Sequence, residues 1–257
     1  MKLYTLGTSA GTQPLAGFHH TSLAIETEKG VYFFDAGECG AYTAHIAGVD
    51  LLNIKAVFIS HPHMDHVGGL GNLLWYIRKM TYVRKEPFKA DKIDILTPCL
   101  ETVDGFMTVL KNTEGDFVTD YEHIVHKISE GLIFDNGDIR VTAVHTDHLP
   151  QRNGDYQSFA FRIECEGKTV VFSGDMRLEN IDSILPEKCD AFLVETGHHQ
   201  IEDICAELKA KNKKVGTLYF VHHGSYIMRD TENAEKRAKA AFGENTVITR
   251  DGMIYNI

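Results

Sequence analysis

The chain has 257 residues, of which 43% are hydrophobic and 24% are charged, as in ordinary soluble globular proteins. Its net charge of −10 argues against a general nucleic-acid binder, because phosphate contacts need a basic surface. The sequence has no apolar run near the ~20 residues of a membrane span, and MKLYTLGTSAG at its start lacks the apolar segment of a signal peptide. We therefore expect a cytoplasmic protein without a membrane partner.

Strands and helices are predicted to follow one another along the chain. Apolar runs bounded by turn residues predict strands at Thr21–Glu26, Val31–Asp35, Lys55–Ser60, Lys92–Thr97, Ile139–His145, Ser158–Glu164, Thr169–Ser173, Asp190–Thr196, Val215–His222 and Thr246–Thr249. Helices are predicted at Gly69–Met80, Glu101–Lys111, Glu202–Lys211 and Thr231–Phe242. Because no Pro/Gly-rich linker interrupts the chain, we expect one domain over residues 1–257, of the α/β class with mixed sheets covered by helices.

Several predicted strands end in polar residues that can bind a metal ion. Asp35, His61, Asp175 and His222 each follow an apolar strand. Side chains in such places are held by a rigid sheet and still reach a cleft, which is where functional residues commonly lie. The five cysteines, in contrast, are scattered without a CxxC pair and are expected to be buried thiols.

The segment HPHMDHVGG, residues 61–69, has the strongest functional signal in the chain. His61 and His63 are two residues apart, so an extended backbone points both rings the same way. Asp65 and His66 follow on a turn and can face a second ion beside the first. The alternative is a loop whose histidines cap the next helix. The density of ligands and the strand–loop–helix context favour metal binding.

Six segments together resemble the successive motifs of the metallo-β-lactamase superfamily, in the order of that family. They are LGTSAG (6–11), FDAGE (34–38), HPHMDHVGG, the TDHLP region, FSGD (172–175) and FVHHGS (220–225). The nearest likeness is to the branch of tRNase Z and related phosphodiesterases. The resemblance implies an αββα four-layer sandwich, with two mixed β-sheets flanked by helices and metal ions at one edge of the sheets.

The resemblance also implies a ligand for each position of a two-ion centre. His61, His63 and a histidine of the TDHLP region would hold the first ion. Asp65, His66 and a histidine of FVHHGS would hold the second ion, and Asp175 would bridge the two. Asp35 would orient a ligand loop through hydrogen bonds, although an aspartate at a strand end is also common in plain turns.

Two of these assignments have alternatives within their motifs. VHTDHLP contains His145 and His148, and we favour His148 because the loop and strand after it resemble the family. FVHHGS contains His222 and His223, and we favour His222 because it ends the apolar strand.

The predicted reaction is hydrolysis by a metal-bound hydroxide, with two divalent ions as cofactors. A set of imidazoles and carboxylates without cysteine favours zinc, with manganese or iron as alternatives. Asp65 is placed to orient the nucleophile or accept its proton. His198, His199 and Tyr226 are candidates for giving a proton to the leaving group, and we place His198 with Asp65 in the catalytic set.

The likeness to tRNase Z is incomplete in two places, which bears on the substrate. Val194 stands where that family has the histidine of a His-Glu-Ala-Thr segment, and residues 149–174 leave no room for its long arm. We therefore expect a small-molecule or short nucleotide substrate, most simply a small phosphodiester. A nucleic-acid partner is left open but is not expected. A lactonase, ester or thioester hydrolase with the same centre is the alternative, followed by a non-catalytic metal-binding scaffold. A homodimer is left open.

Two further segments have competing interpretations. Residues 78–92, RKMTYVRKEPFKADK, are basic and aromatic enough to hold a nucleotide, but a solvated helix end is favoured. In YEHIVH, His123 and His126 are spaced for one face of a helix, and we expect a surface or packing role.

Overall fold

The structure is a computed structural model that describes residues 1–13 and 15–257. Its contacts divide the chain into two compact units, each of which is built around one sheet. Unit 1 comprises residues 1–7, 19–128 and 251–256, and unit 2 comprises residues 8–18, 129–250 and 257. Among the described residues, no helix has the length and apolar character needed to span a membrane.

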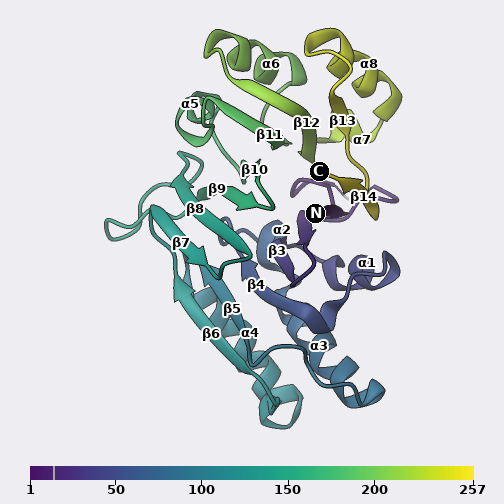
Figure 1. Ribbon diagram of the computed structural model, residues 1–257, viewed down its shortest axis with the longest axis vertical. Helices are drawn as coiled ribbons and strands as arrows, with labels where there is room; N and C mark the ends of the chain where they lie inside the picture. The colour runs from purple at the N-terminus through teal and green to yellow at the C-terminus, as the bar shows by residue number, and fades with distance from the viewer. Residues whose placement is uncertain (14) are drawn as a thin grey trace. The chain divides into compact units, whose positions relative to one another are not determined.

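The sheet of unit 1 has seven strands in the order β14-β1-β2-β3-β4-β5-β6. Figure 1 labels β3 to β6 and β14 of this sheet. The strands are β1 (Lys2–Gly7), β2 (Ser22–Glu26), β3 (Val31–Ala36), β4 (Ile54–Phe58), β5 (Lys92–Thr97), β6 (Glu122–Lys127) and β14 (Met253–Asn256). β3 to β6 run parallel to one another, whereas β2, β1 and β14 pair antiparallel. The sheet is therefore mixed.

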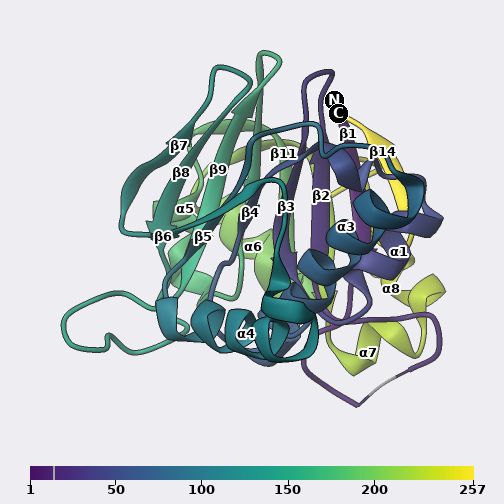
Figure 2. The same ribbon diagram turned by 90° about the horizontal axis from the view of Figure 1, so that it is seen from below.

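Helices cover one face of this sheet (Figure 2). They are α1 (Gly40–Ile46), α2 (Met64–Val67), α3 (Leu70–Arg84) and α4 (Leu100–Thr113), with short 3₁₀ turns at Leu51–Asn53 and Gly115–Phe117. Leu74 of α3 and Val103 of α4 are buried in one apolar cluster with Val57 of β4. Burial of this kind stabilises a sheet face by roughly 25 cal/mol per Å² of apolar surface.

The sheet of unit 2 also has seven strands, in the order β13-β12-β11-β10-β9-β8-β7. The strands are β7 (Gly131–Asp135), β8 (Ile139–His145), β9 (Phe159–Cys165), β10 (Lys168–Phe172), β11 (Lys188–Thr196), β12 (Lys214–His223) and β13 (Thr246–Ile248). The helices are α5 (Ile181–Ile184), α6 (Ile201–Ala210), α7 (Ser225–Met228) and α8 (Thr231–Ala241), with a 3₁₀ turn at Leu178–Asn180. Ile204 of α6 and Ala238 of α8 pack in one cluster with Phe220 of β12.

The two sheets repeat one pattern, which places the candidate site residues at equivalent positions. In unit 2, β10 to β13 are parallel and β9, β8 and β7 pair antiparallel, as in unit 1. Asp35 lies at the end of β3, and Asp175 follows the equivalent strand β10. HPHMDH follows β4, and the Gly197–His199 turn follows the equivalent strand β11. Each unit therefore presents polar side chains at the carboxyl ends of matching parallel strands.

These observations confirm the predicted fold class, two mixed β-sheets flanked by helices. The predicted single domain stays a prediction. The helical spacing noted for His123 and His126 does not describe this segment, because Glu122–Lys127 forms the edge strand β6, which is only partly buried. Cys39 is partly exposed, whereas the other four cysteines are buried as expected.

Candidate metal centre and active site

The first cluster consists of His61, His63, Asp65 and His66 in unit 1. It begins directly after β4, whose residues Ala56 to Phe58 are fully buried. His63 has an extended backbone and precedes α2, which contains Asp65 and His66. The chain then turns at Gly69, where a Cβ atom would lie 2.2 Å from the carbonyl oxygen of Gly37. Gly69 therefore lets this loop approach the end of β3.

Asp35 contacts the loop and one of the rings of the first cluster. Its Oδ1 accepts the Ser60 N–H at 2.6 Å, and its Oδ2 accepts the Ser60 hydroxyl at 2.8 Å. Oδ2 also lies 2.6 Å from Nδ1 of His66, and both side chains are fully buried. Asp35 has a left-handed backbone (φ 60°), which is unusual for a residue with a side chain. These contacts tie Asp35 to the segment that contains HPHMDH.

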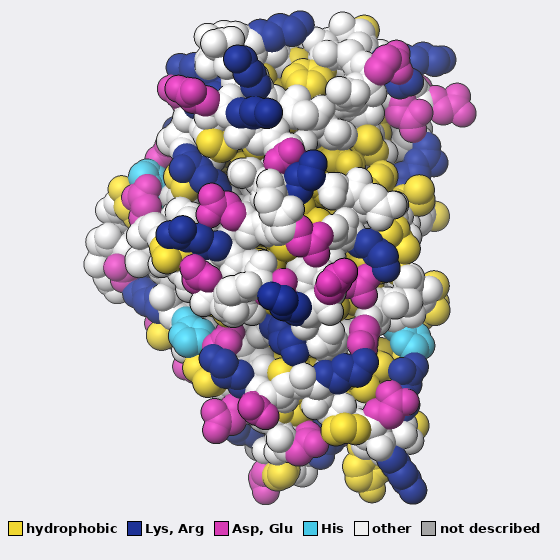
Figure 3. All heavy atoms as spheres, viewed as in Figure 1, with side chains coloured by type: hydrophobic (Ala, Val, Ile, Leu, Met, Phe, Trp, Pro, Cys, Tyr) yellow, Lys and Arg dark blue, Asp and Glu magenta, His cyan; other side chains and the backbone are white. Residues whose placement is uncertain are grey.

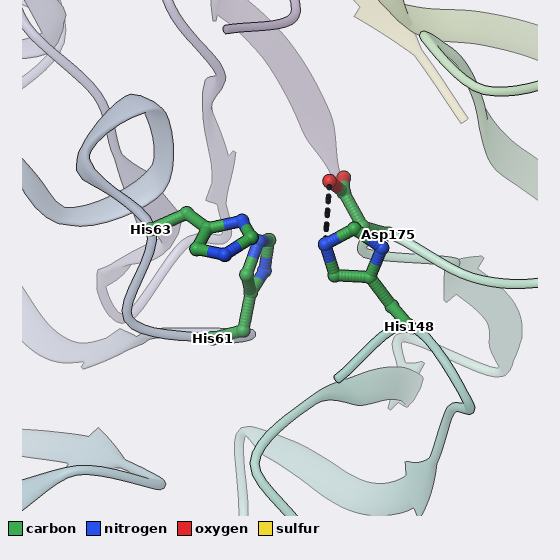
Figure 4. A group of neighbouring side chains, drawn as sticks. All are labelled: His61, His63, His148 and Asp175. Atoms are coloured by element: carbon green, nitrogen blue, oxygen red, sulfur yellow. Dashed lines mark ion pairs between the residues drawn. The ribbon is translucent and has the colours of Figure 1, made fainter. Parts of the chain in front are cut away.

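The rings of the first cluster converge. The centroids of His61 and His66 are 4.0 Å apart. Those of His61 and His63, whose rings Figure 4 shows, are 4.6 Å apart. Nδ1 of His61 lies 3.0 Å from the Ser60 hydroxyl, and Nδ1 of His66 is held by Asp35. Because a histidine whose Nδ1 is engaged in this way presents Nε2, both rings are suited to ligate a metal through Nε2.

The second cluster consists of His148, Asp175 and His222 in unit 2. Oδ2 of Asp175 lies 3.5 Å from Nε2 of His148, the ion pair that Figure 4 shows, and Oδ1 lies 3.2 Å from Nε2 of His222. Asp175 is 2% exposed and His222 is 1% exposed. The carboxylate therefore presents a different oxygen to each imidazole, as a bridging ligand would.

The loops of the second cluster are fixed by side-chain hydrogen bonds to the backbone. The Thr146 hydroxyl donates to the carbonyl oxygen of Asp175 at 2.7 Å. The side chain of Asn180 donates to Asp147 at 2.7 Å and accepts the backbone N–H of the same residue at 3.0 Å. The loop with His148 is thereby tied to the turn that holds Asp175.

The structure separates the two histidine alternatives by position. His145 points away from the cluster: its Nδ1 lies 3.0 Å from Glu130, and its ring stacks on Tyr156 at 3.9 Å. His223 is fully buried, and both of its ring nitrogens are hydrogen-bonded, to Thr196 and Thr249. Burial lowers the pKa of His223 to about 4. His148 and His222, which we favoured, lie beside Asp175.

The three proton-donor candidates have different surroundings in unit 2. Nε2 of His199 donates to the carbonyl oxygen of Met176 at 3.0 Å, and the Tyr226 hydroxyl donates to that of His199 at 3.0 Å. Burial raises the pKa of Tyr226 to about 12. His198 is 44% exposed, and its Nδ1 lies 3.0 Å from Oε1 of Glu195. Of the three, His198 is the side chain that is both exposed and oriented by a carboxylate.

Glu195 is a site residue whose contact with His198 we did not predict. It is fully buried at the end of β11, where it accepts the backbone N–H groups of Met176 and His198. The signal in the sequence is a charged residue that directly follows a long apolar strand. A buried carboxylate needs such donors, because burying an unpaired charge is costly.

The donor sets of both clusters fit divalent metal ions. Imidazole nitrogens and carboxylate oxygens are ligands for zinc and similar ions. Within unit 2 alone, Asp175, His198 and His222 each offer a ligand atom within 4.8 Å of the others. The carboxylate–histidine pairs Asp35–His66 and Glu195–His198 also match the contacts that commonly orient metal-binding histidines.

The basic segment at 78–92 is largely neutralised by acidic neighbours. Lys79 lies 2.7 Å from Glu114, and Lys89 lies 2.6 Å from Asp50. Lys92 lies 2.9 Å from Asp94. Basic and acidic side chains are likewise interspersed over the face shown in Figure 3. This pattern favours the solvated-surface interpretation over a nucleotide-binding patch.

Comparison with known proteins identifies the family. A family model described as anti-Pycsar protein Apyc1 matches residues 1–244. Ribonuclease Z of Bacillus velezensis is 23% identical over an alignment of 290 positions, which covers 97% of this chain and 87% of that protein. Ribonuclease Z of Methanothermobacter thermautotrophicus is 28% identical over 150 residues, which is 58% of this chain. That match spans 45% of the Methanothermobacter protein, so the chain spans about half the length of this relative.

Solved structures show the same fold. The metallo-β-lactamase fold protein YhfI from Bacillus subtilis matches with a TM-score of 0.75 and 18% identity, over 99% of this chain and 98% of that chain. Human tRNase Z, short form, matches with a TM-score of 0.70 and 19% identity, over 100% and 99%. The predicted superfamily and its tRNase Z-like branch are confirmed. The chain belongs to the family of the anti-Pycsar protein Apyc1, and it has the metallo-β-lactamase fold.

Proposed function

We propose that the protein is a binuclear metal-dependent hydrolase that cleaves a small phosphodiester. The arrangement around Asp175 is the observation that carries this proposal, because one carboxylate presents each of its oxygens to a different imidazole. The imidazole cluster after β4 and the relatives named ribonuclease Z support it.

The proposed ligands are those expected from the sequence. His61, His63 and His148 would hold one divalent ion, and Asp65, His66 and His222 would hold the other, with Asp175 shared. Zinc is the metal that this donor set favours, with manganese or iron as alternatives. Such ions act as Lewis acids and lower the pKa of water to near neutrality.

The protein's own residues would then guide the proton. Asp65 would orient the attacking water and accept its proton. Because Glu195 holds Nδ1 of His198, the opposite nitrogen, Nε2, is the atom that would give a proton to the leaving oxygen. Proton transfer of this kind typically contributes 10²–10⁴-fold to a rate.

The substrate is proposed to be small for a structural reason. β8 ends at His145 and β9 begins at Phe159, and the connection between them contains only residues 146–158. β9 and β10 occupy most of the remaining chain up to Asp175, which leaves no long arm to grip a folded RNA. The smallest molecule that combines a nucleotide with a phosphodiester is a cyclic mononucleotide, so this class is the first to test.

RNA is a second candidate substrate, favoured by the relatives named ribonuclease Z and by the likeness to human tRNase Z. A substrate panel separates the candidates. Protein loaded with zinc or manganese is offered bis-p-nitrophenyl phosphate, 3′,5′-cyclic mononucleotides, a lactone, a thioester and precursor tRNA. We expect hydrolysis of small phosphodiesters and intact tRNA.

Two variants control this panel. Asp65→Ala should abolish hydrolysis, and Asp91→Ala, which removes an exposed carboxylate of the same unit, should not. Hydrolysis of the lactone or thioester alone would replace the proposal with the ester hydrolase. Clean 3′ processing of precursor tRNA would replace the small substrate with RNA.

A further inference from the structure

His223 lies beside the proposed ligand His222 but belongs to a different set of contacts. It is fully buried, and its ring meets that of Phe18 edge-on at 6.3 Å. Nε2 lies 2.9 Å from the carbonyl oxygen of Thr249 and Nδ1 lies 3.0 Å from the Thr196 hydroxyl. Because a carbonyl oxygen only accepts, Nε2 is the donor. Nδ1 faces the Thr196 hydroxyl, which also lies 3.1 Å from the carbonyl oxygen of Val221.

The backbone of His223 is held as firmly as its ring. Its N–H donates to the carbonyl oxygen of Thr8 at 2.6 Å, and its own carbonyl oxygen accepts the Ala10 N–H at 3.0 Å. His223 therefore joins β12 to the ends of β11 and β13 and to the 8–10 segment.

The register of β11 and β12 shifts at this point. Glu195 pairs with Val221, but the next residue, Thr196, pairs with His223. His222 is the extra residue between these pairs, and its backbone is left-handed (φ 48°). A non-glycine residue with this backbone persists only when its surroundings hold it there. The bulge turns the ring of His222 toward Asp175, so that Nε2 of His222 lies 3.2 Å from Oδ1 of Asp175.

A second contact limits the space around the ring of His222. A Cβ atom at Gly197 would lie 2.8 Å from Cδ2 of His222 and 2.9 Å from the Cβ of Ala10. The residue between Thr196 and His198 is therefore restricted to glycine while His222 keeps its place.

We propose that His223 is a positioning residue, which holds the bulge through Thr196 and Thr249 and thereby aims His222 at its metal position. This inference rests on the proposed function, because it takes His222 as a ligand. The two adjacent histidines then have different roles: His222 binds the metal ion, and His223 holds the backbone that orients His222.

The test measures zinc affinity by calorimetry and needs no substrate. His223→Phe keeps a ring against Phe18 and removes both ring hydrogen bonds, and we expect it to weaken zinc binding about 10–100-fold, the effect typical of losing an orienting contact. His223→Gln restores an amide donor and acceptor and should recover part of the loss. Thr142→Val is the control, because it makes a polar-to-apolar change on β8 of the same unit. It should bind zinc with the affinity of the unmodified protein.

A double variant shows whether His223 acts through His222. If it does, His222→Ala/His223→Phe should bind zinc no more weakly than His222→Ala alone, because coupled sites are not additive. Additive losses, or a His223→Phe variant with unchanged affinity, would overturn the inference. If His223→Phe fails to fold, Thr196→Val removes the Nδ1 partner more gently and is read the same way. Absence of zinc binding by the unmodified protein would instead overturn the proposed function.

Discussion

Nδ1 of His66 lies 2.6 Å from Oδ2 of Asp35, and neither side chain is exposed to solvent. The carboxylate belongs to the end of β3 and the imidazole to the helical turn after β4, so one hydrogen bond joins two neighbouring parallel strands at their carboxyl ends. The same carboxylate accepts two hydrogen bonds from Ser60. Asp35 therefore fixes the loop and the ring orientation together.

Replacing this carboxylate tests its role directly. Asp35→Asn keeps the shape but removes the charge that favours the Nδ1–H tautomer of His66. We expect zinc affinity to fall about 10–100-fold, as when other carboxylate partners of metal-binding histidines are lost. Calorimetric titration measures this, with Asp94→Asn as the control, because Asp94 bonds Lys92 and His126 instead. Equal affinity in the two variants would show that Asp35 has only a structural role.

The alternative histidines of the TDHLP region are separated by alanine substitution. We expect His148→Ala to lose metal and activity, because its Nε2 lies beside Asp175. His145→Ala removes only the contacts with Glu130 and Tyr156 and should retain both. Metal analysis and initial rates on the two purified variants measure the difference. The reverse order would exchange the ligand assignment without affecting the fold.

The role of His198 is tested by varying the leaving group. A p-nitrophenolate leaves without help, whereas the alkoxide of a nucleotide needs a proton. His198→Ala should therefore lower kcat by about 10²–10⁴-fold for the alkyl ester and far less for the p-nitrophenyl ester. Glu195→Gln should also lower kcat more for the alkyl ester than for the p-nitrophenyl ester, since Glu195 orients the ring of His198. An equal loss of kcat on both substrates would show that His198 does not act as the proton donor. His126→Ala, which removes an exposed histidine of unit 1, is the control and should leave kcat unchanged on both substrates.

Stability should fall in mild acid because of His123. Burial lowers the pKa of His123 from 6.5 to about 4, so the unfolded chain binds this proton more readily than the folded one. The contribution of neutral His123 to the unfolding free energy is complete above the pKa of 6.5 in the unfolded chain. It is lost as the pH falls toward 4, the pKa in the folded protein. We expect about 1–2 kcal/mol less unfolding free energy at pH 5 than at pH 7 from this residue.

Denaturant unfolding at both pH values measures this difference. His123→Phe should reduce the pH dependence, because a phenyl ring suits the neighbours Phe117 and Tyr121 without titrating. Thr108→Val, an exposed substitution elsewhere in unit 1, should leave the pH dependence intact. If the difference in unfolding free energy between pH 5 and pH 7 is the same in His123→Phe as in the unmodified protein, other groups cause the acid sensitivity.

The sequence predicted most of the buried strands and missed β6 and β7, which are half-exposed; it also missed β1, although that strand is largely buried. β4 and β10 end in apolar runs that are visible without a structure, and Ile139–His145 was predicted with its observed bounds. The edge strands β6 and β7 are half-exposed, so they lack the apolar alternation that marks a strand. The equivalence of the two sheets was also invisible, because it is a likeness of strand pairing rather than of side chains.

For the site, the sequence predicted the residue types and left their contacts open. HPHMDH is dense enough to indicate metal ligands. His222 was favoured over His223 by its position at the strand end, but the bulge that sets the direction of each ring is not visible in the sequence. That bulge lies opposite Glu195 and Thr196, far away in the chain. The pairing of Glu195 with His198 likewise depends on how the turn after β11 closes.

The central claim, a two-ion centre that hydrolyses phosphodiesters, is tested most directly by metal titration of the apoprotein. Zinc or manganese is added in steps, and hydrolysis of bis-p-nitrophenyl phosphate is measured at each metal-to-protein ratio. The proposed ligand set predicts that activity rises until about two ions are bound per chain and then stays level. Activity that is complete at one ion, or absent at every ratio with both metals, would contradict the proposal.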